Sequence, residues 1–228
     1  IYSSGTAAIV VRSDIDRPNA DKPYPANAAD LEGLTIGVTA RGAASEFYIR
    51  AAAMDAGIDP DSITYVATGG IGTTMAALDA KEIDGWLGFE PGISICVHAT
   101  ELCDVIADFR EGVGPSKIVD SNPAVIITTQ SYLDDNLDVA DRFVRALSDA
   151  IDWMEDPANT AALEALVAEN LGGVDGVVER IVADNANTFG ILLEEERYEN
   201  TLGYLAEVGI IEEVPPYSEA VLQLGGSG

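Results

Sequence analysis

The order of hydrophobic segments between residues 31 and 128 is the feature that most constrains the fold. Short β-branched runs predict strands, and amphipathic segments over 45–56 and 72–80 predict helices between them. The strand-forming runs are "LTIGVTA", "ITYVATG" and "IDGWLGF". Because strands that alternate with helices form parallel β-α-β units, this order predicts one α/β unit with a mainly parallel sheet.

The spacing of apolar residues predicts which face of each helix is buried. In the helix over 45–56, Phe47, Ala51 and Met54 share one face, and Gly57 is typical of a residue that ends a helix. Beyond residue 129 the pattern is almost entirely helical. Helices are expected over 138–154, 158–170, 174–188 and 194–208. The first of these carries Val139, Phe143, Leu147, Ile151 and Met154 at helical spacing.

The loop after the first predicted strand of this unit is suited to holding an anion. Thr39, Arg41, Gly42 and Ser45 lie where a strand ends and a helix begins, so backbone N–H groups there meet the positive end of the helix dipole. The two hydroxyls add donors, and Arg41 can grip a carboxylate, sulfonate or phosphate. The alternative is that Ser45 only caps its helix and Arg41 is solvated.

Two later loops add candidate ligand-binding residues. "TGGIGTTM" places Gly70 and Thr73 where the backbone can approach a ligand closely, although no Lys follows the glycines as in nucleotide-binding loops. "DGWLGFEPG" places Trp86, Phe89 and Glu90 at the end of a strand, suited to stacking and to accepting hydrogen bonds. The alternative is that the aromatic residues pack under a helix. Ligands of open α/β sheets bind beyond the carboxyl ends of the strands, where all three loops fall.

Two cysteines and one histidine leave little scope for metal binding or acid–base catalysis. On one unbroken helix Cys96 and Cys103 would lie about 10 Å apart in rise, too far for a disulfide, and they could pair only if the helix ends before Cys103. Two buried free thiols are therefore expected. Cys96 is two residues from His98, but side chains at that spacing diverge on a helix. We expect no catalytic residue, no metal site and no cofactor.

The acidic balance of the chain restricts its partners. Acidic residues outnumber basic ones by 39 to 12, which gives a net charge of −27. Such a field repels nucleic acid and anionic lipid, and no apolar run is long enough for membrane insertion. The acidity is spread over every predicted helix instead of forming a tail. We interpret it as adaptation to high salt, as in a possible halophile, with an ordinary acidic surface as the alternative.

A family resemblance covers nearly the whole chain. The sequence from "DLEGLTIGVTARGAASEFYIRAA" to "IDGWLGFEPG" resembles the second lobe of periplasmic substrate-binding proteins of the nitrate, sulfonate, taurine and thiamine-precursor class. This class is called the NMT1/THI5-like or SsuA/TauA-like family. The resemblance continues through "NPAVIITTQSYLDDN", "VADRFVRALSDAIDWM" and "LGYLAEVGIIEEVPP". It is specific for the superfamily and says nothing about the ligand.

The resemblance implies a type II periplasmic-binding-protein-like fold, in which two crossover strands join two α/β lobes. Residues 1–12 would be the first crossover strand, at 6–11, and a remnant of lobe 1. Residues 13–123 would form lobe 2. Residues 124–228 would hold the return crossover, at 124–129, and the C-terminal helices of lobe 1. Members of the family begin with a further β-α-β stretch, so lobe 1 is expected to be incomplete in this chain.

The function that the resemblance implies is transport. The chain would be a non-enzymatic extracytoplasmic receptor that binds a small organic or anionic molecule between the lobes and delivers it to the membrane subunits of an ABC importer. Its place would be the periplasm or the outer face of the cell membrane, although Ile1 to Val11 show no signal peptide. The alternatives are a ligand-sensing regulatory domain, or an enzyme on the same fold that resembles a pyrimidine synthase or a desulfinase.

Overall fold

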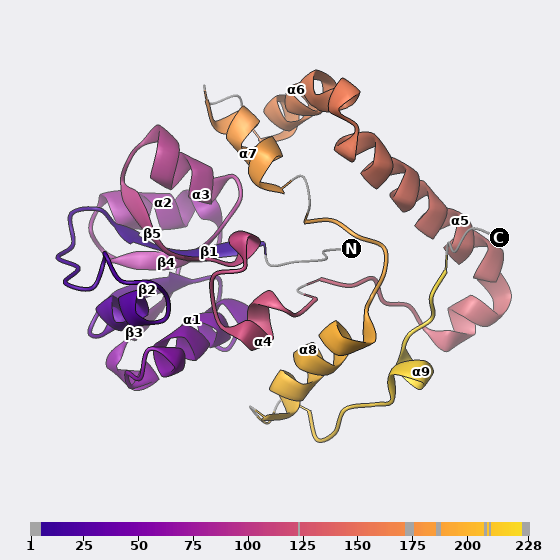
Figure 1. Cartoon of the computed structure of the whole chain (residues 1–228), viewed down its shortest axis with the longest axis horizontal. Coiled ribbons are helices and arrows are strands. Elements are labelled where there is room, and N and C mark those ends of the chain that lie inside the picture. The colour runs from indigo at the N-terminus through magenta and orange to yellow at the C-terminus, as the bar shows by residue number, and fades with distance from the viewer. Residues whose placement is uncertain are drawn as a thin grey trace.

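The computed structural model describes residues 6–122, 124–171, 176–185, 188–207, 209 and 211–224. The chain divides into an α/β unit, from β1 (Ala7–Arg12) to α4 (Ser116–Val119), and a helical part, from α5 (Gln130–Glu155) to α9 (Tyr217–Ala220) (Figure 1). The helical part lies beyond one edge of the sheet, and α5 lies far from it. The final residues 225–228 lie outside the described part of the chain.

A five-stranded sheet in the order β3-β2-β4-β1-β5 forms the centre of the α/β unit. The remaining strands are β2 (Thr35–Val38), β3 (Thr64–Ala67), β4 (Gly85–Phe89) and β5 (Cys103–Asp108). β2 runs parallel to β3 and β4, as the β-α-β order predicts. β1 runs antiparallel between β4 and β5. The expected α/β fold is therefore present with a mixed sheet, and β5 is a strand that the sequence patterns missed.

The first strand lies at the heart of the sheet. All six residues of β1 are buried, and Ile9 pairs with Leu87 on one side and Ala107 on the other. Residues 6–11 were expected to be the first crossover strand, by which the chain enters this unit. Since β1 is bonded on both sides within the sheet, it is a structural part of the α/β unit; residues 1–5 lie outside the described residues.

Helices cover both faces of the sheet (Figure 1). The helix α1 (Ala44–Asp55) and the 3₁₀ turn η1 (Ala26–Leu31) pack on one face, in a core that includes Ile36 and Leu87. The helices α2 (Ile71–Asp79) and α3 (Gly92–Ser94), with the π-helix η3 (Ile95–Ala99), cover the other. Its core includes Leu78 and Trp86. The prediction that Met54 faces inward is wrong, because its side chain is 57% exposed.

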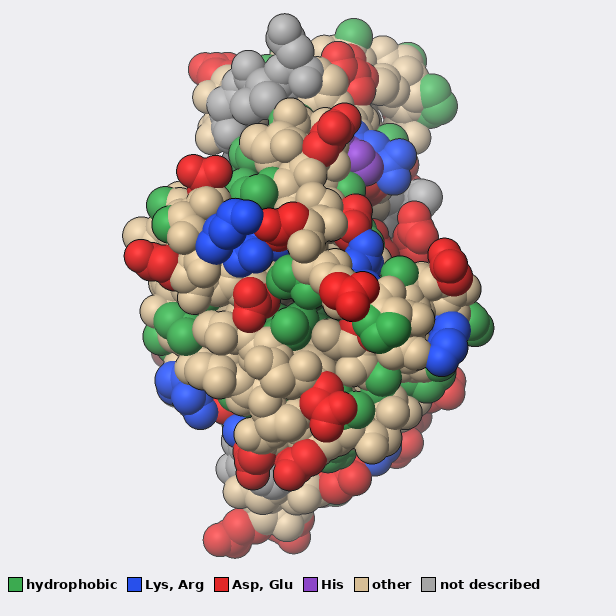
Figure 2. Space-filling view, turned by 90° about the vertical axis from the view of Figure 1, so that its left-hand side faces the viewer, with side chains coloured by type: hydrophobic (Ala, Val, Ile, Leu, Met, Phe, Trp, Pro, Cys, Tyr) green, Lys and Arg blue, Asp and Glu red, His purple; other side chains and the backbone are tan. Residues whose placement is uncertain are grey.

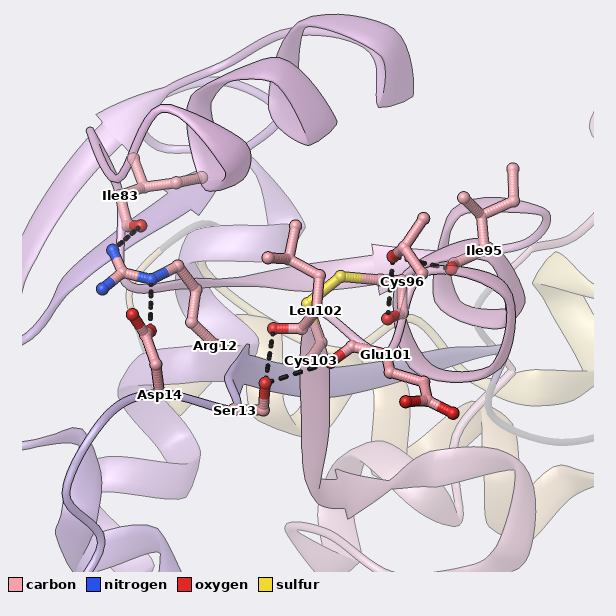
Figure 3. The surroundings of a disulfide bond; sticks show 10 residues. Arg12, Ser13, Asp14, Ile83, Ile95, Cys96, Glu101, Leu102 and Cys103 are labelled. Atoms are coloured by element: carbon pink, nitrogen blue, oxygen red, sulfur yellow. Dashed lines mark hydrogen bonds and ion pairs between the residues drawn. A yellow bond between two sulfur atoms is a disulfide. The ribbon is translucent and has the colours of Figure 1, made fainter.

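The two cysteines form a disulfide, which corrects the prediction of free thiols (Figure 3). Their Cα atoms are 5.3 Å apart, because η3 ends at Ala99 and the chain turns back before Cys103 begins β5. Both side chains are buried in the core beneath η3. The same turn is held by Ser13, whose hydroxyl donates to the carbonyls of Glu101 and Leu102.

The predicted strand over 124–129 is absent. These residues have no regular secondary structure, and Val125, Ile126 and Ile127 are exposed, the last to 86%. A β-branched run becomes a strand only when a neighbouring strand accepts its hydrogen bonds. Within the described part of the chain, none of the five strands of the sheet pairs with these residues.

The helical part follows the predicted pattern. After α5 come η5 (Pro157–Asn159), α6 (Thr160–Leu171), α7 (Val177–Asn185) and α8 (Glu195–Glu207). α7 packs on α3 and η3, whereas α8 packs on α4. None of the 26 residues of α5 is buried, and Phe143 is 50% exposed. Its regular apolar stripe is thus largely uncovered.

Acidic side chains are dispersed over the one face that Figure 2 shows. On the side of the α/β unit that faces away from the C-terminal helices, they stand singly among basic and apolar residues and form no single patch (Figure 2). Among the described residues, no helix has both the length and the apolarity needed to cross a bilayer. No cluster of three or more histidine, cysteine or acidic side chains suited to a metal ion occurs in the same residues.

Candidate functional site

The three candidate loops meet at the end of the sheet where the parallel strands finish, which we call the carboxyl edge. β2, β3 and β4 are parallel, so the loops after Val38, Ala67 and Phe89 leave the same edge. β1 starts at this edge, since Ala7 pairs with Phe89. The edge faces the C-terminal helices (Figure 1). The three loops therefore converge at the carboxyl ends of the strands, as expected.

The first loop ends at an open helix N-terminus. The N-cap of α1 is Ala43, which supplies no side-chain acceptor, so the N–H groups of the first turn are not capped from there. The hydroxyl of Ser45 does not cap the helix either. It lies 3.0 Å from the backbone nitrogen of Thr39 and 2.9 Å from its hydroxyl. Ser45 is buried and Thr39 is exposed, so the pair fixes the loop and presents one hydroxyl at its surface.

Arg41 is occupied by a carboxylate of the protein itself. Its Nε lies 2.8 Å from Oε2 of Glu46, its Nη2 lies 3.2 Å from Oε1, and its Nη1 donates to the carbonyl of Tyr65. Glu46 also accepts from the backbone nitrogen of Gly42 and from Arg50. Although burial opposes ionisation, these hydrogen bonds lower the pKa of Glu46 to about 2. Arg41 therefore brings no uncompensated positive charge to the loop.

The second loop presents another uncapped helix. Gly70 is the N-cap of α2, and a Cβ built there would meet no atom within 4 Å. The hydroxyl of Thr73 donates to the carbonyls of Thr68 and Gly70, and that of Thr74 donates to Gly70 at 3.0 Å. Gly69 has φ of +72°, a conformation that favours glycine. The loop thus brings open backbone to the edge of the sheet.

The third loop brings less to the surface than the sequence suggests. Trp86 is 3% exposed and belongs to the core beneath α2 and α3. A Cβ on Gly92 would lie 2.7 Å from Cη2 of Trp86, so glycine there makes room for the indole. This burial matches the alternative of an aromatic packed under a helix. Phe89 points to the other face of the sheet, where it is half-buried against the core of α1.

Glu90 lies in a buried ion cluster that the sequence did not reveal. Its carboxylate accepts from the backbone nitrogen and hydroxyl of Ser94 and pairs with Arg110, which also pairs with Asp108 and Asp184. Burial opposes the charge, but Asp108 and the other carboxylates outweigh it and raise the pKa of Arg110. The only part of this cluster that a local sequence pattern could reveal is the pair Asp108 and Arg110, because Asp108 caps the turn that carries Arg110. Asp184 is distant in sequence and could not be found from a motif.

Apart from Arg41, which is exposed but paired with Glu46, the exposed candidate residues at this edge are uncharged. They present the hydroxyls of Thr39 and Thr73 and the glycine backbone at Gly42 and Gly70, beside the first turns of α1 and α2. Helix N-termini carry partial positive charge and free N–H donors. Such a surface can bind an oxygen-rich polar or anionic group through backbone donors.

Comparisons with known proteins bear on the whole chain. The model of the family described as NMT1/THI5 like matches residues 19–160. The alkanesulfonate-binding protein SsuA from Xanthomonas axonopodis pv. citri bound to MOPS is similar in structure, with a TM-score of 0.73 and 16% identity over 97% of this chain and 71% of that one. No functionally curated protein matches the chain in sequence.

Two further structures show how widely the fold is used. A ligand-binding component of an ABC-type import system from Staphylococcus aureus, with zinc bound, has a TM-score of 0.71 and 15% identity over 96% of this chain and 69% of that one. The desulfurization enzyme DSZB has a TM-score of 0.58 and 16% identity over 96% of this chain and 74% of that one. Across five of the matched structures, the chain spans 64–71% of the other protein's length.

Proposed function

Because the chain belongs to the NMT1/THI5-like family, we propose that it is the ligand-binding part of an extracytoplasmic solute receptor. The receptor binds a small organic or anionic molecule and delivers it to the membrane subunits of an ABC importer. The observation that carries the proposal is the convergence of two helix N-termini without side-chain caps, those of α1 and α2, at the carboxyl edge of the sheet. Backbone donors in this position are suited to polar and anionic ligands.

The candidate residues divide by their accessibility. Thr39, Gly42, Gly70 and Thr73 are exposed and contact the ligand in this proposal. Ser45 holds Thr39 in place, and Phe89 supplies an apolar wall.

The three remaining candidates are more constrained. Arg41 supports the loop through Glu46, with part of its guanidinium still exposed beside α1. Trp86 and Glu90 act behind the surface, because burial keeps both from direct contact.

Capture depends on a second lobe in this proposal. The C-terminal helices belong to that lobe, and the exposed run over 124–129 and the apolar stripe of α5 are suited to packing within it. Closure of the lobes is favoured only to the extent that the ligand prefers the closed state. The chain spans about two thirds of the length of its structural relatives, so capture, delivery and the ABC-importer partner are proposals for the whole protein.

The disulfide supports a location outside the cytoplasm. Disulfides persist in oxidising compartments such as the periplasm and are rare in the cytosol. Cys96 and Cys103 are the only cysteines of the chain, and both are in the bond. Because both sulfurs are in the bond, neither Cys96 nor Cys103 is proposed as a nucleophile.

A binding assay on the full-length protein tests the proposal. Melting is measured with millimolar ethanesulfonate, taurine, nitrate and an aminopyrimidine, and co-purified ligand is sought by mass spectrometry under native conditions. A receptor of this class should gain several degrees in melting temperature with one solute class. Gly70→Ala should weaken that binding about tenfold, because a methyl group enters the open N-terminus of α2.

The matched control is Gly203→Ala in α8, where a Cβ also meets no atom within 4 Å. It should leave affinity unchanged. Equal losses of affinity in the two variants would show that the α2 N-terminus is not part of the binding site. Turnover of any of these solutes would contradict the binding role.

A further inference from the structure

One guanidinium joins three separate parts of the molecule. Arg110 follows β5 in the 3₁₀ turn η4 (Phe109–Glu111) and binds Asp108 with two hydrogen bonds, at 2.8 and 2.6 Å. Its remaining nitrogen Nη1 donates to Glu90, in the loop after β4, and lies 3.6 Å from Oδ2 of Asp184 on α7. Arg110 is therefore the common partner of the end of β5, the loop after β4 and α7.

The cluster is buried, so its members depend on one another. The side chain of Arg110 is 5% exposed, and those of Glu90, Asp108 and Asp184 are 11%, 12% and 16% exposed. Arg180 on α7 is the second cation, 2.8 Å from Asp184. Glu90 and Asp184 share the single nitrogen Nη1 of Arg110, so a change at Asp184 alters how Arg110 faces Glu90. A shift of α7 away from the sheet would therefore disturb the contacts that Arg110 makes with the other carboxylates.

Glu90 connects the ion cluster to the candidate site. Its carboxylate holds the start of α3 through the backbone nitrogen and the hydroxyl of Ser94, at 3.1 and 3.0 Å. Phe89, a candidate ligand contact, directly precedes it. The segment 89–94 is thus fixed by the same carboxylate that binds Arg110.

Helix α7 is one link between the α/β unit and the helical part, and α8, which packs on α4, is another. Val177, Val178 and Ile181 are buried, and α7 packs on α3 and η3. It also packs against α6, which in turn contacts α5. Through these contacts, α7 connects α6 and α5 to the α/β unit.

We infer that Arg110 and Asp184 form an anchor that couples the position of α7 to the ligand loop at residues 89–94. Arg110 is a positioning residue in this role, acting through Glu90 without contacting the ligand. The inference uses the proposed function only in treating residues 89–94 as a ligand loop. The coupling itself exists with or without bound solute.

Amide hydrogen exchange on the full-length protein, with no solute added, tests the anchor. Asp184→Asn removes the charge at nearly constant shape, and exchange should rise about tenfold both in 177–185 and in 89–94, with the rest of the α/β unit unchanged. Arg180→Gln is the matched control, since it removes the exposed partner of Asp184 and keeps Arg110. It should leave exchange in 89–94 as in the wild type. Asp184→Glu, which restores the charge, should bring both segments back toward wild-type exchange.

Three results would overturn the inference. Faster exchange in 177–185 alone would mean that α7 is anchored without coupling to the loop. No change in either segment would mean that the ion pair holds nothing. A uniform rise across the chain would make Asp184 a general stability residue. Since no solute is used, these results are independent of whether the protein binds one, and a failure of the solute assay leaves them intact.

Discussion

The guanidinium of Arg41 lies against the carboxylate of Glu46, with Nε 2.8 Å from Oε2 and Nη2 3.2 Å from Oε1. Arg41 is largely exposed, whereas the Glu46 side chain is only 7% exposed. Gly42 and Arg50 donate to the same carboxylate, so Glu46 ties the loop to the first turn of α1. Arg41, which the sequence suggested for ligand binding, thus also stabilises its own loop.

Acid should weaken the fold through Glu46. Hydrogen bonds from Arg41, Gly42 and Arg50 outweigh burial and lower its pKa to about 2, below the roughly 4.3 of an unfolded chain. A lowered pKa stabilises the fold above the unfolded value, and that contribution is lost as pH falls through the folded value. Chemical unfolding from pH 6 to pH 2 should show the free energy of unfolding falling between about pH 5 and pH 2.

Asp14 also has a lowered pKa, about 2, because Lys81 and Arg12 donate hydrogen bonds to its carboxylate. The variant Glu46→Gln separates the contribution of Glu46 from that of Asp14. The variant should lose about 1–3 kcal/mol at pH 7 and show a shallower pH dependence than the wild type. Glu199→Gln, which changes an exposed carboxylate on α8, should keep the wild-type profile. Parallel profiles for wild type and Glu46→Gln would contradict the assignment.

Arg41→Ala should cost about 1 kcal/mol of stability, because it leaves a buried carboxylate with one fewer partner. The matched control is Arg142→Ala, which breaks the exposed pair with Asp138 on α5 and should cost at most about 0.5 kcal/mol. Urea unfolding of both variants at pH 7 measures the difference. Equal costs would show that Arg41 behaves as an ordinary surface residue, free to serve a ligand.

Reducing the disulfide should lower stability by about 2–3 kcal/mol. The bond closes a short loop, with a sequence separation of 7, and loop-closure entropy predicts this magnitude. Melting with and without a thiol reductant measures the loss. The double variant Cys96→Ala with Cys103→Ala should melt below the oxidised protein and be insensitive to reductant. An identical response of the double variant and the wild type would mean that the thiols are not paired in solution.

Salt should stabilise the ligand-free protein. With 39 carboxylates against 12 basic groups, repulsion acts across the surface over about 30 Å at 0.01 M salt and over only about 3 Å at 1 M. The melting midpoint should therefore rise between these concentrations of sodium chloride. Sucrose at matched osmolality controls for solvent exclusion. A flat response would mean that local ion pairs already compensate the charge, and the interpretation as salt adaptation would lose its physical support.

Local rules were sufficient for much of the architecture. The helix over 45–56 and the strands on either side of it follow from apolar spacing. Gly57 ends α1 with φ of +75°, as predicted, while the nitrogen of Ile58 donates to the carbonyl of Ala53. The convergence of three loops at one edge also followed from the β-α-β order, because parallel strands must end together.

Long-range partners decided the rest. Ile9 lies between Leu87 and Ala107, and no local pattern shows that this run pairs on both sides with strands far along the chain. The pairing of Cys96 with Cys103 depended on where η3 ends, and the burial of Trp86 depended on the room that Gly88 and Gly92 leave for its ring.

At the candidate site, too, local patterns predicted some features and long-range packing decided the others. The sequence determined by itself which residue types stand at the carboxyl ends of the strands, because strand and helix periodicity are properties of neighbouring residues. Only the tertiary structure decided that Arg41 faces Glu46 and that Arg110 gathers Glu90 and Asp184, since a charge selects its partner by distance in space. Residues far apart in the chain acquire that distance only when the sheet and α7 have packed.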